Sequence, residues 1–312
     1  MVDSAFDALL RDVDRCAPRA GPRIRRWLDA LSPTGKGVDR FTHRRAFPTL
    51  ALPWWAESAI CGTVDLELQH DLIRSSLAGY AFIRLLDDVM DRDPRAEPSL
   101  LPAAGVLHTL FEAPYHARFE PSSPFWDYFR KAWGESAEAA IVEAEQTTLD
   151  ESAFHAMSAR KFAAVEIPLA AACLSHDRPD AIGGWFQLAR VIGRHEQMID
   201  DLLDWMRDQD AGRPSYLLSE ALRQSGRHPG GATGWIVSHG LDWAFARMEK
   251  YREEARALAR ELRSAEVEEW LDDRESLVEE IGSELRPGLE SLGRLSLVFA
   301  APGFDGGLLV NN

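Results

Sequence analysis

Residues 72–91 read LIRSSLAGYAFIRLLDDVMD, and this stretch indicates the fold class. Its apolar residues recur at intervals of three and four, as on one face of an α-helix, whereas period-two alternation is nearly absent from the chain. The same reasoning predicts helices over residues 3–15, 22–31, 50–61, 65–91, 99–112, 124–147, 150–175, 180–208, 214–223, 234–264 and 266–292. We therefore expect an all-α protein, a single large helical bundle with 65–91 and 180–208 as its inner helices.

The length and composition are those of an ordinary globular protein. The chain has 312 residues, of which 46% are apolar and 27% are charged, and this length predicts one large domain or two small ones. No repeat of 20–50 residues is visible, which argues against a helical solenoid. We expect one domain over residues 1–312, with its core at about 30–292 and a flexible tail at 301–312.

The net charge, the cysteines and the apolar runs argue against several classes of protein. Fifty acidic residues against 35 basic ones give a formal net charge of −15, which repels nucleic acid and anionic lipid. Three scattered cysteines argue against a disulfide framework, and the acidic start MVDSAFDALLRDVD is unlike a signal peptide. The longest apolar run, near 167–174, is too short to span a membrane. We expect a cytoplasmic protein without a nucleic-acid partner.

Two aspartate motifs carry the functional information. The first is Asp87-Asp88-Val89-Met90-Asp91, the second is Asp200-Asp201-Leu202-Leu203-Asp204, and each follows a strongly apolar helical run. Positions i and i+4 share a helix face, so the first and last aspartates of each motif project together and repel each other unless a cation lies between them. Carboxylate oxygens suit Mg²⁺. An ordinary solvated acidic face is the alternative, but two such motifs arise by chance with a probability on the order of 0.01.

Several segments around these motifs resemble one enzyme family. Residues 193–204 look like the GxxxQxxDDxxD helix of the trans-prenyl diphosphate synthases, which are all-helical class I isoprenoid synthases. Residues 157–164 resemble the KT(G/A) helix of this family, with Phe162 where threonine is usual. Residues 212–218 resemble, in shortened form, the segment after the second motif, and residues 35–40 resemble the N-terminal GKxxRP element. The resemblance covers roughly residues 30–290.

The resemblance implies a fold, a cofactor and a set of site residues. The fold would be a bundle of the isoprenoid synthase type with a central active-site cavity, in a homodimer. Three Mg²⁺ ions would bind with the diphosphate of a prenyl substrate, held by Asp87, Asp91, Asp200 and Asp204. Asp88, Asp201 and Gln197 would complete the catalytic set. The substrate-binding residues would be Lys161, Arg213, Arg95, Lys36 and Arg40 around the diphosphate, and Phe82 and Ile83 at the floor of the pocket.

The departures from the family pattern concern the second substrate. Chain-elongating members carry a histidine directly before the first motif and an RRGxP run after it, and these groups help to hold isopentenyl diphosphate. Here Leu86 precedes the motif, and residues 92–98 read RDPRAEP. The glutamate and histidine that usually lie earlier on the same helix are replaced by Ser76 and Gly79. By this resemblance, we expect the half of the site that ionises an allylic diphosphate to be intact and the half that binds the acceptor to be eroded.

This pattern predicts a Mg²⁺-dependent enzyme that ionises an allylic diphosphate and forms a terpene, with release of pyrophosphate. Ile83 and Phe82 lie four and five residues before the first motif, and the bulky ring of Phe82 favours a substrate of ten or fifteen carbons. One alternative is a prenyltransferase that elongates the substrate with isopentenyl diphosphate. Another is a non-catalytic helical partner of such a synthase. Arg84 is interpreted as a helix salt bridge to the first motif.

Overall fold

The computed structural model describes residues 1–226 and 231–300, and these residues form an all-helical protein without a β-strand. The α-helices are α1 Val2–Cys16, α2 Gly21–Ala30, α3 Asp39–Thr42, α4 Ala51–Cys61, α5 Leu66–Met90, α6 Leu101–Arg118, α7 Phe125–Glu145, α8 Glu151–Lys161, α9 Glu166–Ser175, α10 Ile182–Ala211, α11 Tyr216–Ser225, α12 Gly231–Trp235, α13 Leu241–Leu262 and α14 Ala265–Ala300. Short 3-10 turns precede α6, α9 and α10, and a π-helix, Ile236–Gly240, precedes α13. The prediction of an all-α protein is confirmed.

The chain divides into two compact units. Unit 1 comprises residues 1–136, 162–189 and 262–264, and unit 2 comprises the described residues of 137–161, 190–261 and 265–300. Helices α7 and α10 each contribute residues to both units. The expected tail, residues 301–312, lies outside the described residues.

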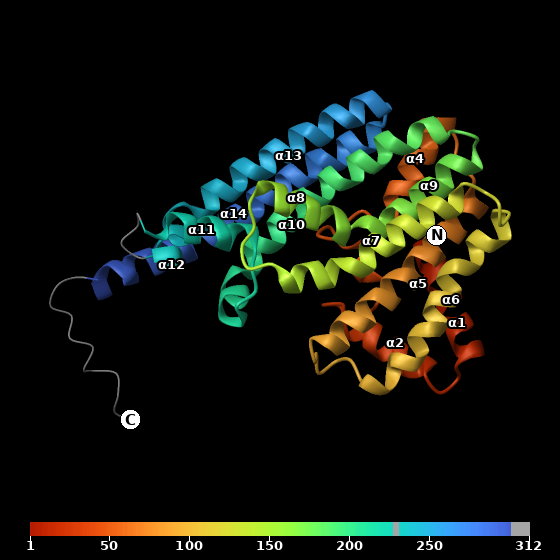
Figure 1. Ribbon diagram of the computed structural model, residues 1–312, viewed down its shortest axis with the longest axis horizontal. Helices are drawn as coiled ribbons and strands as arrows, with labels where there is room; N and C mark the ends of the chain where they lie inside the picture. The colour runs from red at the N-terminus through yellow and green to blue at the C-terminus, as the bar shows by residue number, and fades with distance from the viewer. Residues whose placement is uncertain (227–230, 301–312) are drawn as a thin grey trace. The chain divides into compact units, whose positions relative to one another are not determined.

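Unit 1 is built around α5, which packs against α6 and α1 (Figure 1). Asp65 caps α5 at its N-terminus, where its carboxylate accepts hydrogen bonds from the backbone N–H groups of Glu67 and Leu68. An aromatic cluster joins α5, α6 and α7, with ring centroids 4.2–6.4 Å apart. Its members are Phe82, His108, Phe111, Tyr115, Phe119, Phe125, Trp126, Phe129 and Trp133. Burial of these rings positions the end of α5, where the first aspartate motif lies.

Unit 2 contains most of α10 and the antiparallel pair α13 and α14, which lie side by side in Figure 1. Ion pairs connect these two helices along their length, from Arg260 with Glu268 to Arg286 with Asp242. Helix α10 ends at Ala211, and the next residue, Gly212, has a φ of +65°, a left-handed conformation that glycine adopts without a steric penalty. The chain then turns into α11, which Ser215 caps through the backbone N–H of Leu218.

Three helix predictions were wrong in their extent. The segment 150–175 is not one helix, because α8 ends at Lys161 and α9 begins at Glu166. The ring of Pro168 would clash with the carbonyl of residue 164 in a continuous helix, which explains the break. Conversely, α6 continues through Pro114 to Arg118 and α14 continues through Pro287 to Ala300. In α6, burial of Phe111 and Tyr115 on either side of Pro114 outweighs the lost backbone hydrogen bond.

Candidate active site

The first aspartate motif lies at the C-terminal end of α5. Asp87 and Asp88 belong to the last turn of the helix, and Asp91 is its C-cap. The helix dipole places partial negative charge at this end, so three carboxylates here are electrostatically unfavourable unless cations offset them. Cationic groups close to this helix end are therefore stabilising.

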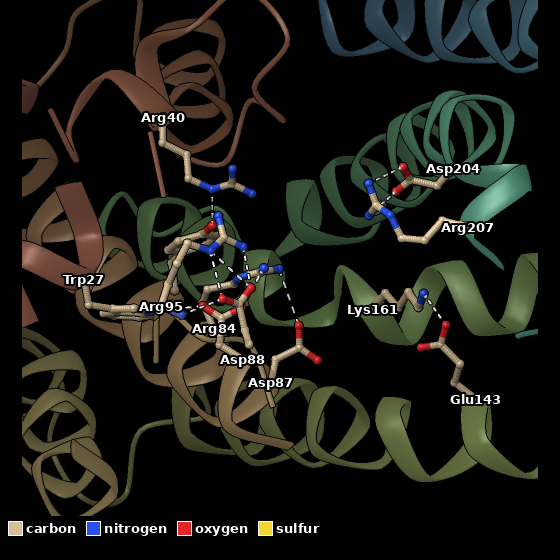
Figure 2. Close-up of polar contacts among 12 residues, drawn as sticks. Trp27, Arg40, Arg84, Asp87, Asp88, Arg95, Glu143, Lys161, Asp204 and Arg207 are labelled. Carbon is tan, nitrogen blue, oxygen red and sulfur yellow. Dashed lines mark hydrogen bonds and ion pairs between the residues drawn. The ribbon is translucent and has the colours of Figure 1, made fainter. Parts of the chain in front are cut away.

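Asp88 is the buried member of this motif. Its side chain is 1% exposed, and one carboxylate oxygen accepts a hydrogen bond from the indole Nε1 of Trp27 at 2.9 Å. The other oxygen lies 2.6 Å from Nη2 of Arg84 (Figure 2). These contacts tie α2 to the end of α5. Asp88 is thus a structural anchor, and it leaves the neighbouring aspartates to face outward.

Asp87 differs from Asp88 in its exposure. Its side chain is 49% exposed, and Nη1 of Arg84 lies 3.4 Å from its Oδ2. Asp91 is also exposed. Arg84 therefore bridges two aspartates of the first motif, and the interpretation of Arg84 as a helix salt bridge is confirmed.

Further arginines gather near this motif in unit 1. Figure 2 shows Arg40 and Arg95 beside Arg84. The Nε of Arg40 donates to the hydroxyl of Tyr80, and Arg95 forms a two-pronged pair with Asp93. The Arg95 side chain is the main reason why the pKa of Asp93 is lowered to about 2. Lys36 is exposed in the loop before α3.

The second motif lies within α10, two turns before its end. Asp201 is buried, accepts a hydrogen bond from the Gln197 amide at 3.0 Å, and accepts another from the backbone N–H of Tyr216 at 2.8 Å. Its second oxygen thereby satisfies the free N–H group at the start of α11. Gln197, expected in the substrate cavity, is buried and serves this contact. Asp201 thus anchors α11 to α10, as Asp88 anchors α2 to α5.

Asp200 and Asp204 are the outward members of the second motif. The pKa of Asp200 is raised to about 7, mainly by desolvation and further by the charges of Glu196, Asp201 and Asp204. Asp200 lies at the surface of unit 2, where these neighbouring carboxylates disfavour its ionisation. Asp204 is half-exposed and lies 3.2 Å from Arg207. Burial raises the pKa of Asp201 to about 6.

Two predicted cations lie in unit 2. Lys161 is the last residue of α8, and its ammonium group donates to Glu143 of α7 at 2.8 Å (Figure 2). Arg213 is exposed directly after Gly212 at the end of α10. Glu143 and Arg207 were not predicted as partners. Arg207 was recognisable from its i, i+3 spacing to Asp204, whereas no sequence pattern connects Glu143 to Lys161.

The residues predicted to line the pocket floor have different surroundings. The ring of Phe82 packs in the aromatic cluster, 5.2 Å from His108 and 5.5 Å from Trp133 between ring centroids. Ile83 is exposed. Phe82 and Ile83 are neighbours in sequence but point in different directions, because successive residues are about 100° apart around a helix.

The carboxylate oxygens of both motifs fit a Mg²⁺ ligand set. No group of three or more His, Cys, Asp or Glu side chains that could hold a metal is found among residues 1–226 and 231–300. Mg²⁺, however, usually takes only one or two carboxylates and fills its shell with waters and substrate phosphates. The crowded charges around Asp200 are what such an ion would neutralise.

Neither a protein-family model nor a curated protein matches the chain. In the described part of the chain, no helix is both long and apolar enough to cross a membrane.

Proposed function

We propose that this protein is a class I isoprenoid enzyme that ionises an allylic prenyl diphosphate with Mg²⁺ and forms a terpene, releasing pyrophosphate. The observation that carries the proposal is that the two motifs share the same pattern of buried and accessible aspartates. In each, the second aspartate is buried and anchors a neighbouring element, whereas the first and last stay accessible to a ligand. A merely solvated acidic surface gives no reason for this repeated arrangement.

The proposed roles follow from these environments. Asp87 and Asp91 would bind Mg²⁺ in unit 1, and Asp200 and Asp204 would bind it in unit 2. When bound, Mg²⁺ supplies positive charge that stabilises the departing diphosphate. Lys161 would exchange its Glu143 partner for a diphosphate oxygen, a charge-assisted hydrogen bond of the same kind. Asp88 and Asp201 would orient the ligands without touching the metal.

Arg40, Arg84 and Arg95 favour a second candidate function. Three guanidinium groups gather near the first motif, although the sequence lacks the usual arginine run there. Such cations could hold the diphosphate of an acceptor. The second candidate is therefore a prenyltransferase that elongates an allylic diphosphate with isopentenyl diphosphate.

One incubation series tests both candidates. The purified protein is incubated with Mg²⁺ and geranyl, farnesyl or geranylgeranyl diphosphate, with and without isopentenyl diphosphate, and pyrophosphate and organic products are measured. We expect hydrocarbon or alcohol products from the allylic diphosphate alone. A strict requirement for isopentenyl diphosphate, with longer prenyl diphosphates formed, would establish the second candidate instead.

Variants connect the activity to the motifs. Asp87→Ala and Asp200→Ala should each reduce turnover by at least about a thousandfold while the helical circular dichroism is unchanged. Asp210→Ala is the matched control, because Asp210 is exposed on α10 outside the motif and should keep full turnover. Undiminished turnover in excess EDTA would contradict the proposal.

A further inference from the structure

Three side chains of unit 2 form a polar cluster that has no role in the proposed function. They are Trp243 and Arg247, which lie one turn apart on the same face of α13, and Tyr216 at the start of α11. The guanidinium of Arg247 lies over the ring of Trp243, 5.3 Å from its centroid. The rings of Trp243 and Tyr216 meet edge to face, with their centroids 5.0 Å apart. Trp243 therefore contacts both of the other side chains.

Each member of this cluster has a hydrogen-bond donor without an acceptor. Within the described part of the chain, no hydrogen bond is formed by the terminal nitrogens of Arg247, the hydroxyl of Tyr216 or Nε1 of Trp243. Of the polar atoms in these three side chains, only Nε of Arg247 is fully buried, so the donors reach solvent. Burial of Nε and the contact with Trp243 hold the guanidinium in place. Its terminal nitrogens stay open to a ligand.

The charges around Arg247 favour an anion. Two carboxylates, Glu151 and Glu220, lie within electrostatic range of its guanidinium, but neither is ion-paired with it. Glu151 accepts a hydrogen bond from Lys250 at 2.7 Å, and Glu220 pairs with Arg223 at 2.7 Å. Three cations therefore stand against two carboxylates, which leaves a surplus of one positive charge on Arg247. This surplus matches a ligand with a single negative charge.

The surface next to this cation is aromatic. Trp235 of α12 is partly exposed, and its ring lies 6.1 Å from that of Trp243 between centroids. Partly exposed indole rings pack against flat apolar groups. A carboxylate is planar, carries one negative charge and accepts two parallel hydrogen bonds from a guanidinium. A phosphate group carries close to two negative charges at neutral pH and exceeds the surplus.

We propose that this cluster binds a small aromatic carboxylate. The carboxylate would accept hydrogen bonds from the terminal nitrogens of Arg247 and from the hydroxyl of Tyr216. The aromatic ring of the ligand would lie against Trp235. The proposal does not depend on the activity proposed above, because it uses none of the side chains assigned to Mg²⁺ or to the diphosphate.

Binding of benzoate to the full chain, measured by calorimetry or ligand-observed NMR, tests this inference. The buffer contains EDTA, so that a metal site cannot contribute. We expect saturable binding of benzoate, with benzamide, its neutral isostere, and acetate, which lacks the ring, each bound at least about tenfold more weakly. Equal binding of benzamide or acetate, tighter binding of inorganic phosphate, or no saturable binding of benzoate up to about 10 mM would overturn the proposal.

Three variants locate the site. Arg247→Gln removes the unpaired charge and should weaken benzoate binding by about tenfold. Tyr216→Phe keeps the buried ring, removes only the hydroxyl, and should weaken binding by about threefold. Arg263→Gln makes the same charge change at an exposed position after α13 and should have no effect. Equal losses in the two glutamine variants, or undiminished binding in Tyr216→Phe, would contradict this site.

Discussion

At the residue scale, the two motifs show that neighbouring aspartates of one sequence pattern serve different purposes. Asp88 is buried between Trp27 and Arg84, whereas Asp87, one residue earlier, is half-exposed. A buried carboxylate must be hydrogen-bonded or ion-paired to offset its lost hydration, and an exposed one need not be. Mutations at the two positions should therefore have separable effects.

The first prediction compares stability at these two positions. Asp88→Asn removes the charge that balances Arg84, so it should lower the free energy of unfolding by about 3 kcal/mol. Asp87→Asn weakens a long ion pair with Arg84 at a half-exposed position and should cost less than about 1 kcal/mol. Urea unfolding followed by circular dichroism measures both values. Equal costs would show that Asp88 is not the structural anchor inferred above.

The second prediction concerns Asp200, whose pKa is raised to about 7 from 3.8. The folded state then binds more protons than the unfolded state between about pH 4 and pH 7, so the free energy of unfolding falls as the pH rises through this window. Solvent screening of this exposed side chain limits the loss to about 1 kcal/mol. Asp200→Asn should recover this amount at pH 8.

Mg²⁺ provides the companion measurement, because it binds the ionised carboxylates. We expect MgCl₂ to raise the melting temperature more at pH 8 than at pH 5, and to do so less in Asp200→Asn. Asp210→Asn serves as the control and should respond like the natural chain. A Mg²⁺ effect that is equal at both pH values would argue against a carboxylate site at Asp200.

At the element scale, α5, α6 and α7 are held together by aromatic rings, and Phe82 is the member of this cluster nearest to the first motif in sequence. Packing against His108 and Trp133 fixes the direction of its ring. Whether a prenyl tail also contacts Phe82 determines whether this residue selects substrate length.

The third prediction tests that role. Phe82→Ala should improve the use of geranylgeranyl diphosphate relative to farnesyl diphosphate by about tenfold, because removing the ring lengthens the space open to the tail. Phe119→Ala is the control, since Phe119 is a half-buried member of the same cluster, stacked on Phe125. An unchanged preference in a folded Phe82→Ala protein would assign the length limit to another side chain.

At the scale of the whole molecule, the excess of acidic residues is the dominant electrostatic property. The folded chain carries a formal net charge of −15 at pH 7, and the isoelectric point calculated from its sequence is about 5.1. Self-repulsion of this kind destabilises the compact state and is screened by salt.

The fourth prediction follows from this charge. At pH 8, raising NaCl from about 0.05 M to about 0.5 M should increase the melting temperature by a few degrees, because the Debye length falls. At pH 5.1 the repulsion disappears, and the same salt should give no increase. Scanning calorimetry measures both conditions, and a salt-induced rise of equal size at the two pH values would rule out self-repulsion as its cause.

The helical class and the positions of the motifs could be predicted from the sequence, because they depend on local periodicity and spacing. The end of α10, which Gly212 marks, is a local feature of this kind. The Arg84 salt bridge was predictable for the same reason, since residues three and four apart on a helix are neighbours.

Which residues of these motifs are buried, and what they contact, depends on the packing of helices that are distant in sequence. Trp27 lies 61 residues from Asp88, and Tyr216 lies 15 residues from Asp201. The partners His195, Glu196 and Arg274 meet only because α14 packs near α10. Helix α6 also continues past Pro114, although proline disfavours the interior of a helix, because the residues around it are packed in the core. Burial and long-range hydrogen bonds depend on how the helices assemble, and the local pattern does not encode that assembly.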